Sequence, residues 1–301
     1  MPSRITVEKG PVYLALTVES SLSEGPAPAR IRQTAVLYHD LKRIDLRNHV
    51  DKAPTISKEQ VYFAFPFRVG GPPVLHMELP YAVMRWDRDI LPGAWKGYEG
   101  IANWARLSGS DLAVTWSSVQ SPVISAGGIN SNRWDPDWHK SYVPSNAHLY
   151  SYIMSNMWNR NYPMWQGGSF PFDYSFTSSQ PAAPLSESAR FGRATVTPLL
   201  ASIGDSHQGA WPTEGFSAAS VSPDNVMITA LKQAEGTDGW VIRLFETGGE
   251  RARIKLTIPG RRPKQAARVN LVEEHVADLA VEAGVVAFEM QPHELASVLI
   301  R

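Results

Sequence analysis

Apolar and polar residues alternate along most of this chain. In RIDLRNHVD, Ile44, Leu46, Asn48 and Val50 fall on one side, and mostly charged residues fall on the other. Successive side chains of a β-strand point to opposite faces, so this period of two predicts strands with one buried face. The pattern predicts strands at residues 12–18, 31–38, 42–50, 60–69, 113–117, 169–177, 226–232, 240–245, 252–258 and 295–300.

Helical periods are scarce. The helix candidates are short, at residues 149–157 and at 186–200, where the second follows the proline-rich QPAAP. Glycine and proline separate the strands at hairpin spacing, as in GGPP at 70–73. We therefore predict an all-β fold in which antiparallel sheets form sandwiches.

The composition changes once along the chain. Residues 201–225, ASIGDSHQGAWPTEGFSAASVSPDN, are rich in glycine, serine and proline and show no period. A compact strand pattern follows them. We predict a large β domain at 1–200, a connector at 201–225 and a small C-terminal β-sandwich at 226–301.

The totals exclude several classes of partner. Lys and Arg number 29 and so do Asp and Glu, which leaves no field to attract nucleic acid or an anionic membrane. No apolar run reaches the roughly 18 residues of a membrane span. Cysteine is absent, which excludes disulfides and thiolate metal sites. The start of the sequence lacks an export signal, which favours the cytoplasm, although a segment preceding Met1 could have carried one.

Residues 156–168, NMWNRNYPMWQGG, have the composition of a sugar-binding surface. Amides donate and accept together, as sugar hydroxyls require, and indole faces suit the C–H face of a pyranose. Paired glycines permit a positive φ or a close backbone approach. The alternative is a loop whose amides satisfy its own backbone and whose rings pack. The candidate carbohydrate-binding residues are Asn156, Trp158, Asn159, Asn161, Tyr162, Trp165, Gln166, Gly167 and Gly168.

The strand that follows this segment has a clear inner face. Phe170, Phe172, Tyr174 and Phe176 share one side, so we predict that they lie in the core. Asp173 lies on the opposite side. It is therefore not a replacement for a catalytic carboxylate.

Few acids are arranged for chemistry. In WDPDWHK, a metal site could be drawn from Asp135, Asp137 and His139 together with His148, but Asp-Pro-Asp is common in turns and a surface loop is favoured. Asp87 and Asp89 in MRWDRDILPG most resemble a reactive pair, against the alternative of a charged loop. We expect Asp45, Asp51 and Glu59 at outward strand positions. No hydrolase, nucleotide or metalloprotease motif is present, so the residues by themselves show no chemistry.

Several stretches carry a family resemblance. They are LYHDLKRIDLRNHVD, AFPF, SDLAVTWSSVQSPVISAGGI, MSNMWNRNYPMWQGG, ARFGRATVTPLLA, NVMITALKQAEGTDGWVIRLFETGG, QAARVNLVEE and HELASVLIR. In this order they resemble the C-terminal β region of family 38 glycoside hydrolases, the α-mannosidase type. The resemblance implies a galactose-mutarotase-like supersandwich followed by a smaller β-sandwich.

The resemblance also implies where the chemistry lies. In the family, a zinc ion and an aspartate nucleophile belong to an N-terminal α/β domain, which would precede Met1. This chain would then hold no cofactor, and zinc is expected only in that domain. The implied partners are the catalytic domain and carbohydrate, with the loop at 156–168 as the part that reaches the substrate cleft.

Three hypotheses about function follow. The leading one is the C-terminal β region of an α-mannosidase-like glycoside hydrolase, whose catalytic residues lie outside this chain. The second is a free-standing carbohydrate-binding module that uses Trp158 and Trp165. The third is a self-sufficient lyase or epimerase on a mutarotase-like sandwich, with His139, His148 or Tyr162 as acid and base.

Overall fold

A computed structural model of the chain describes residues 4–23, 25, 27–129, 142–156, 164–204, 216–259 and 262–301. The chain divides into two compact units. The large unit comprises Met1–Pro80, Met84–Ala183 and Phe191–Pro198, and the small unit comprises Tyr81–Val83, Pro184–Arg190 and Leu199–Arg301. The boundaries predicted at 200 and 226 stay a prediction.

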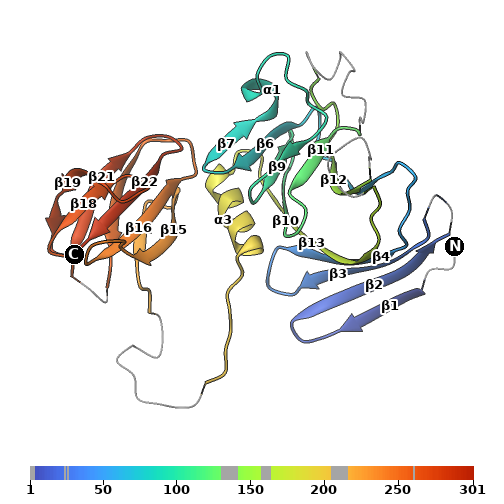
Figure 1. Cartoon of the computed structure of the whole chain (residues 1–301), viewed down its shortest axis with the longest axis horizontal. Coiled ribbons are helices and arrows are strands. Elements are labelled where there is room, and N and C mark those ends of the chain that lie inside the picture. The colour runs from blue at the N-terminus through green and yellow to red at the C-terminus, as the bar shows by residue number, and fades with distance from the viewer. Residues whose placement is uncertain are drawn as a thin grey trace. The chain divides into compact units, whose positions relative to one another are not determined.

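Two antiparallel sheets make up the described part of the large unit (Figure 1). The larger sheet has nine strands, in the order β1 (Arg4–Lys9), β2 (Tyr13–Leu22), β3 (Ala29–Tyr38), β4 (Ile44–Lys52), β13 (Gly168–Ser179), β10 (Ala113–Ser118), β9 (Ala105–Ser108), β6 (Val74–Leu79) and β7 (Ala82–Arg85). The other has four strands, in the order β5 (Gln60–Pro66), β12 (His148–Ser155), β11 (Val123–Ala126) and β8 (Glu99–Gly100).

Aromatic rings join the two sheets of the large unit. The Tyr174 ring of β13 lies 4.9 Å from the Phe65 ring of β5, measured between centroids, and Phe65 lies 5.3 Å from Trp116 of β10. Phe63 contacts Phe172 and Tyr174 in the same layer. The prediction that the aromatic face of residues 170–176 lies in the core is confirmed.

The small unit is a second sandwich. In its described part, one sheet has the order β14 (Ser220–Ser222), β17 (Ala252–Thr257), β21 (Val285–Met290) and β20 (Val281–Glu282). The other has the order β15 (Val226–Gln233), β16 (Trp240–Glu246), β22 (Leu295–Ile300), β18 (Ala266–Val269) and β19 (His275–Leu279). Aliphatic side chains fill the space between them, among them Ile242, Leu244, Ile254, Leu256 and Val298, all of which are fully buried.

Two helices lie within the described ranges, α1 (Trp86–Asp89) and α3 (Leu185–Val196). The helix predicted at 186–200 corresponds to α3. None of the described helices is both long enough and apolar enough to cross a membrane. The all-β prediction is confirmed, and each of the ten predicted strands overlaps an observed one.

The helix predicted at 149–157 is wrong. Residues 148–155 form strand β12, which pairs with β5 and β11. The register between β12 and β5 shifts between Tyr152 and Met154. A β-bulge of this kind inserts one extra residue and breaks the period of two, so the apolar positions of the strand no longer alternate.

The positions expected for two acids are also corrected. Asp45 has only 8% of its surface exposed, because it accepts hydrogen bonds from Tyr38, Arg43 and Ser175 inside the sheet. Glu59 lies at 15% side-chain exposure in an ion pair with Lys52. Charged residues are rarely buried unless they are paired, and both of these acids are paired. Asp51 is exposed, as predicted.

Candidate functional site

The described ends of segment 156–168 are held by backbone contacts. Asn156 is 1% exposed, and its side chain uses both of its ends. Its Oδ1 accepts from the Glu59 amide at 2.7 Å, while its Nδ2 donates to the carbonyls of Thr55 at 3.0 Å and Ser57 at 2.5 Å. Both N–H donors are used, and the side chain is buried, so its polar atoms are not presented to a sugar hydroxyl. Asn156 thus fastens the loop before β5 to the end of β12.

Gln166 has a similar role at the other end of the segment. Its Oε1 accepts from the backbone amide of Ser155 at 2.8 Å. Its carbonyl accepts from the Lys52 ammonium at 3.2 Å, and Lys52 also donates to the Ala53 carbonyl and pairs with Glu59. An ammonium has three donors, so these three acceptors use all of them. The resulting cluster, Lys52, Glu59, Asn156 and Gln166, is structural.

Gly167 and Gly168 lie at positions where the backbone disfavours a side chain. A Cβ on Gly167 would lie 2.6 Å from the backbone nitrogen of Pro54, closer than side-chain carbons approach such atoms. Gly168 has a φ of +134°, which L side chains rarely adopt. Both features that the sequence suggested for this pair, a close approach and a positive φ, are present.

Trp165 differs from its neighbours. It is 54% exposed, and the adjacent Met164 is 53% exposed. An indole this open can take a sugar ring on its face. The other candidates of the segment, Trp158, Asn159, Asn161 and Tyr162, lie outside the described residues.

Two hollows open beside this segment along β12. One has a volume of about 310 Å³ and the other about 400 Å³, and Ile153, Met154 and Gln166 line both. The second hollow also contains Tyr98 and Tyr152. The two rings lie 5.7 Å apart, and Tyr152 stacks on Tyr62 at 4.8 Å with an interplanar angle of 15°.

Sequence analysis missed this tyrosine cluster. Tyr62 and Tyr152 are opposite each other in the β5–β12 register, and Tyr98 comes from the segment before β8. Burial raises the pKa of the Tyr62 hydroxyl, and Tyr98 and Tyr152 add to that effect. This phenol therefore stays neutral, and its hydroxyl donates to Gln60 Oε1 at 3.2 Å. The strand predicted at 60–69 was the available signal, but the segment that contains Tyr152 was predicted as a helix at 149–157.

The acids considered for catalysis are bound to neighbouring groups. Asp87 accepts two hydrogen bonds from the Arg85 guanidinium, at 2.7 and 2.8 Å. Asp89 accepts from Arg88 and from the Arg85 backbone. These hydrogen bonds hold the pKa of both carboxyls below their usual range, so neither one is suited to donate a proton near neutral pH.

The remaining candidates that lie among the described residues, Asp173 and His148, have separate surroundings. The Asp173 carboxylate accepts a hydrogen bond from Gln120 Nε2 at 3.1 Å, and the Asp173 backbone amide donates to Gln120 Oε1 at 2.7 Å. His148 is at the start of β12, next to Tyr150, and lines neither hollow. Asp135, Asp137 and His139 lie outside the described residues. Within the described ranges, no group of three or more His, Asp or Glu side chains could hold a metal ion.

Comparisons with known proteins relate this architecture to one family. A family model described as "Glycosyl hydrolases family 38 C-terminal beta sandwich domain" matches residues 225–298. Comparison with curated proteins found no match.

Two solved structures match nearly the whole chain. It is similar to an alpha-mannosidase from Enterococcus faecalis V583, with a TM-score of 0.75, 10% identity, and coverage of 99% of this chain and 35% of that one. It is also similar to a protein of glycosyl hydrolase family 38 from Enterococcus faecalis, with a TM-score of 0.73, 10% identity, and coverage of 99% and 36%.

The resemblance to the C-terminal β region of family 38 glycoside hydrolases is therefore confirmed, by the sandwich model at 225–298 and by the fold of the whole chain. The chain spans about 35% of the length of the α-mannosidase that it matches. The narrower likeness to galactose mutarotases stays a prediction.

Proposed function

We propose that this chain is the C-terminal β region of an α-mannosidase-like glycoside hydrolase and that it packs on a separate catalytic α/β domain. One observation carries the proposal: 99% of the chain aligns with only 35% of an α-mannosidase, and residues 225–298 match the C-terminal sandwich of the family. The other part of such an enzyme would supply the nucleophile and the zinc ion.

The ionisation of the carboxyl groups supports the proposal that catalysis takes place on the other domain. A retaining glycosidase needs two carboxyl groups about 5–5.5 Å apart across the scissile bond, and the proton donor needs a raised pKa. Asp45, Asp87 and Asp89 are instead held ionised by guanidinium and hydroxyl groups. Their role is to order the strands and turns around them.

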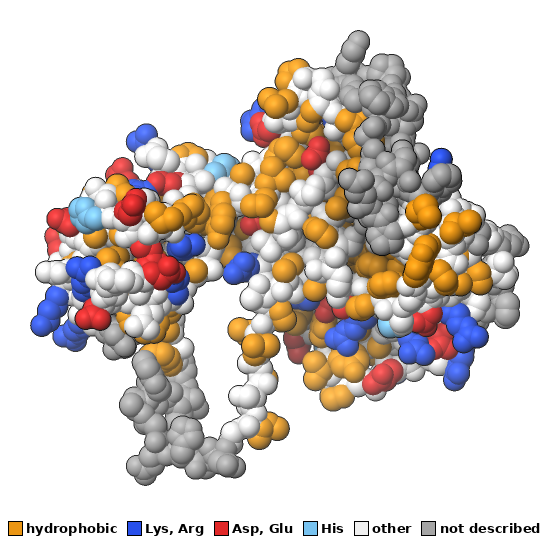
Figure 2. All heavy atoms as spheres, viewed as in Figure 1, with side chains coloured by type: hydrophobic (Ala, Val, Ile, Leu, Met, Phe, Trp, Pro, Cys, Tyr) orange, Lys and Arg blue, Asp and Glu red, His pale blue; other side chains and the backbone are white. Residues whose placement is uncertain are grey.

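An apolar sheet face offers a docking surface for the catalytic domain. Strands β1, β2 and β3 extend the face of β4 that lines the core. Directly opposite one another in these four neighbouring strands are Val7, Leu16, Ala35 and Leu46, so their side chains share one face of the sheet. Ile5 and Val7 are 63% and 62% exposed, and Leu14, Leu16 and Leu37 are 38–43% exposed. In Figure 2 such apolar side chains lie among charged ones in this region. A contiguous apolar face of this kind usually marks a protein interface.

Carbohydrate contact is the finer part of the proposal. Trp165 and the hollow with Tyr98 and Tyr152 would touch the substrate, since these rings are accessible while Asn156 is fully engaged. Substitution of Trp165 by alanine would then raise the KM of the assembled enzyme and leave its kcat nearly unchanged.

The test begins with the coding sequence next to this chain. An in-frame α/β segment with paired Asp and His is co-expressed with the chain, and the two are expected to co-elute and to hydrolyse an aryl α-mannoside together. The double variant Ile5→Lys, Val7→Lys should abolish co-elution, while Val272→Lys, a substitution at a more exposed valine of the small unit, should not. Turnover by this chain alone that is lost in Asp87→Ala would overturn the proposal.

A further inference from the structure

The small unit contains a cleft of about 610 Å³ on the outer face of its five-stranded sheet. This volume lies within the range of about 300–1,000 Å³ that small-molecule sites occupy. The floor of the cleft consists of aliphatic side chains from neighbouring strands of the sheet. Ala267 lies opposite Leu299 in the β18–β22 register, and Val269 follows on the same face. Val281 closes one side.

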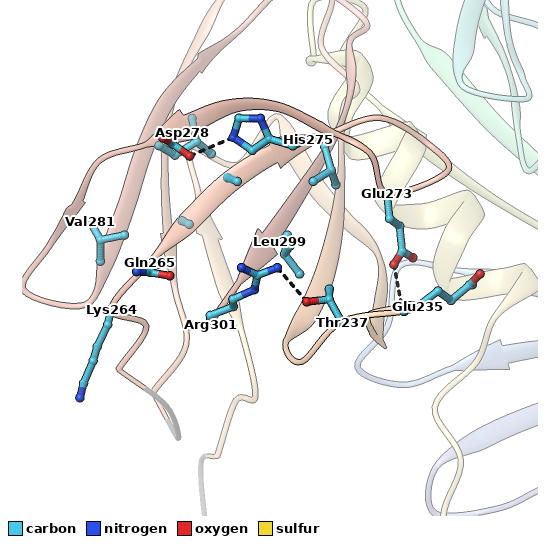
Figure 3. A pocket seen from close by; sticks show the side chains of 15 residues that line it. Glu235, Thr237, Lys264, Gln265, Glu273, His275, Asp278, Val281, Leu299 and Arg301 are labelled. Carbon is cyan, nitrogen blue, oxygen red and sulfur yellow. Dashed lines mark hydrogen bonds and ion pairs between the residues drawn. The ribbon is translucent and has the colours of Figure 1, made fainter.

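One end of the cleft is rich in hydrogen-bond donors (Figure 3). The Arg301 guanidinium donates to Thr237 Oγ1 at 2.8 Å and to the Asp238 carbonyl at 3.1 Å. A guanidinium has five N–H donors, so two bonds orient it and leave three. Gln265 is paired with Arg301 through the backbone, and its side-chain amide has no partner within the described ranges.

The other end of the cleft supplies acceptors. Asp278 lies opposite Ala267 in the β18–β19 register and is bonded to His275 Nε2 at 2.9 Å. Its side chain is 93% exposed, so a carboxylate oxygen remains open to a ligand. Glu273 lies away from Asp278, beside Glu235 (Figure 3), and Lys232 neutralises it through an ion pair of 2.7 Å.

This arrangement selects the class of ligand. An anion would meet the Asp278 carboxylate, and a cation would meet Arg301 and Lys264, so neither charge is favoured over the whole cleft. A neutral molecule with many hydroxyl groups can accept from the guanidinium and the amide and donate to the carboxylate. Its C–H groups would cover the aliphatic floor.

We propose that this cleft binds one pyranose ring of a neutral carbohydrate, placed on Ala267 and Leu299 and hydrogen-bonded to Gln265, Arg301 and Asp278. The residues that line the cleft include none from the segment at 156–168. It would hold a glycan to the protein without cutting it. The choice of mannose as the first probe rests on the proposed function, whereas the cleft itself rests on its own residues.

The proposal is tested by titrating the ¹⁵N-labelled full chain with methyl α-D-mannopyranoside and then with methyl β-D-glucopyranoside. An open cleft with few contacts implies a Kd of about 1 mM, so the titration extends to about 10 mM. We expect saturable shifts of the backbone amides at 236–237, 265–267 and 278, and of the Gln265 side-chain amide.

Two variants and one control locate the binding. Gln265→Ala and Asp278→Asn should each raise the Kd at least about fivefold, the loss of one hydrogen bond to the ligand. Gln233→Ala removes an exposed glutamine from the same sheet outside the cleft and should leave the Kd unchanged.

Three results would overturn the inference: no saturable shift with either glycoside, shifts centred on Trp165 and Tyr98 instead, or equal affinity in all variants. Co-elution with a catalytic domain needs no sugar. A cleft that does not bind would therefore leave the proposed function standing.

Discussion

Glu246 and His293 are bonded between neighbouring strands of the small unit: Glu246 Oε2, at the end of β16, accepts the backbone amide of His293, just before β22, at 2.8 Å. The same fully buried carboxylate also accepts from Asn225 and from the backbone amides of Gly248, Gly249 and Glu250. One side chain thus provides hydrogen-bond acceptors for backbone amides in the turn after β16 and in the loop before β22. Buried amides of this kind are costly when they lack a partner.

Replacement of Glu246 by glutamine should destabilise the small unit. The amide nitrogen would face N–H donors on one side, so at least one buried donor loses its acceptor, at a cost of about 1–3 kcal/mol. Urea denaturation followed by tryptophan fluorescence measures the loss. Glu250→Gln, at an exposed neighbour, serves as the control, and equal stability of the two variants would contradict this role for Glu246.

Lys52 should behave as half of an enclosed ion pair. The Lys52 side chain is 5% exposed, so Lys52→Met leaves Glu59 without its counter-charge and should cost about 3–5 kcal/mol. The double variant Lys52→Met, Glu59→Leu should recover part of this loss, because no buried charge remains. Lys42→Met, at an exposed lysine, should change the free energy of unfolding by less than about 0.5 kcal/mol. A double variant no more stable than the single one would refute the pairing.

Glu78 gives a pH-dependent prediction. Burial raises the pKa of its carboxyl, and the hydrogen bond from Asn103 at 3.0 Å opposes only part of that effect. A raised folded-state pKa means that the folded protein holds the proton more tightly, so stability falls as the pH rises from the ordinary glutamate value through the folded one.

The variant Glu78→Gln should remove this pH dependence. It keeps an acceptor for Asn103 and carries no charge, so it should stabilise the protein at pH 8 relative to the parent and do so less at pH 5. Melting temperatures across this range measure the difference. Glu289→Gln, at an exposed position of β21, should show no such trend, and a parallel trend in both variants would contradict the explanation.

Gly167 should tolerate no side chain. Gly167→Ala places a carbon 2.6 Å from the Pro54 nitrogen, and overpacking of this kind costs about 1–3 kcal/mol. Gly100→Ala is the matched control, since a Cβ there meets no atom within 4 Å. Thermal unfolding of the two variants compares them directly. If Gly167→Ala were as stable as Gly100→Ala, the loop at Pro54 would not be held against the segment as described.

Much of the fold could be predicted locally, and the exceptions have identifiable causes. Strand β4 was evident because Leu46, Asn48 and Val50 alternate with Arg47 and His49. Strand β12 was misassigned because its bulge between Tyr152 and Met154 interrupts the same alternation. Asp45 looked like a surface residue because nothing in its neighbourhood reveals that Ser175, 130 positions away, donates to it.

The sequence alone determined the all-β architecture, the aromatic core face of β13 and the family resemblance, because alternation and ordered motifs are properties of neighbouring residues. Only the tertiary structure decided what the polar side chains do. Asn156 is as polar as any sugar ligand in sequence, yet its side chain is engaged by Thr55, Ser57 and Glu59. The side-chain amide of Gln265, which the sequence did not suggest as a ligand, has no partner within the described ranges and lies beside Arg301. A hydrogen-bonding group is free or engaged according to the partners that the folded chain places within about 3 Å of it, and those partners come from distant parts of the sequence.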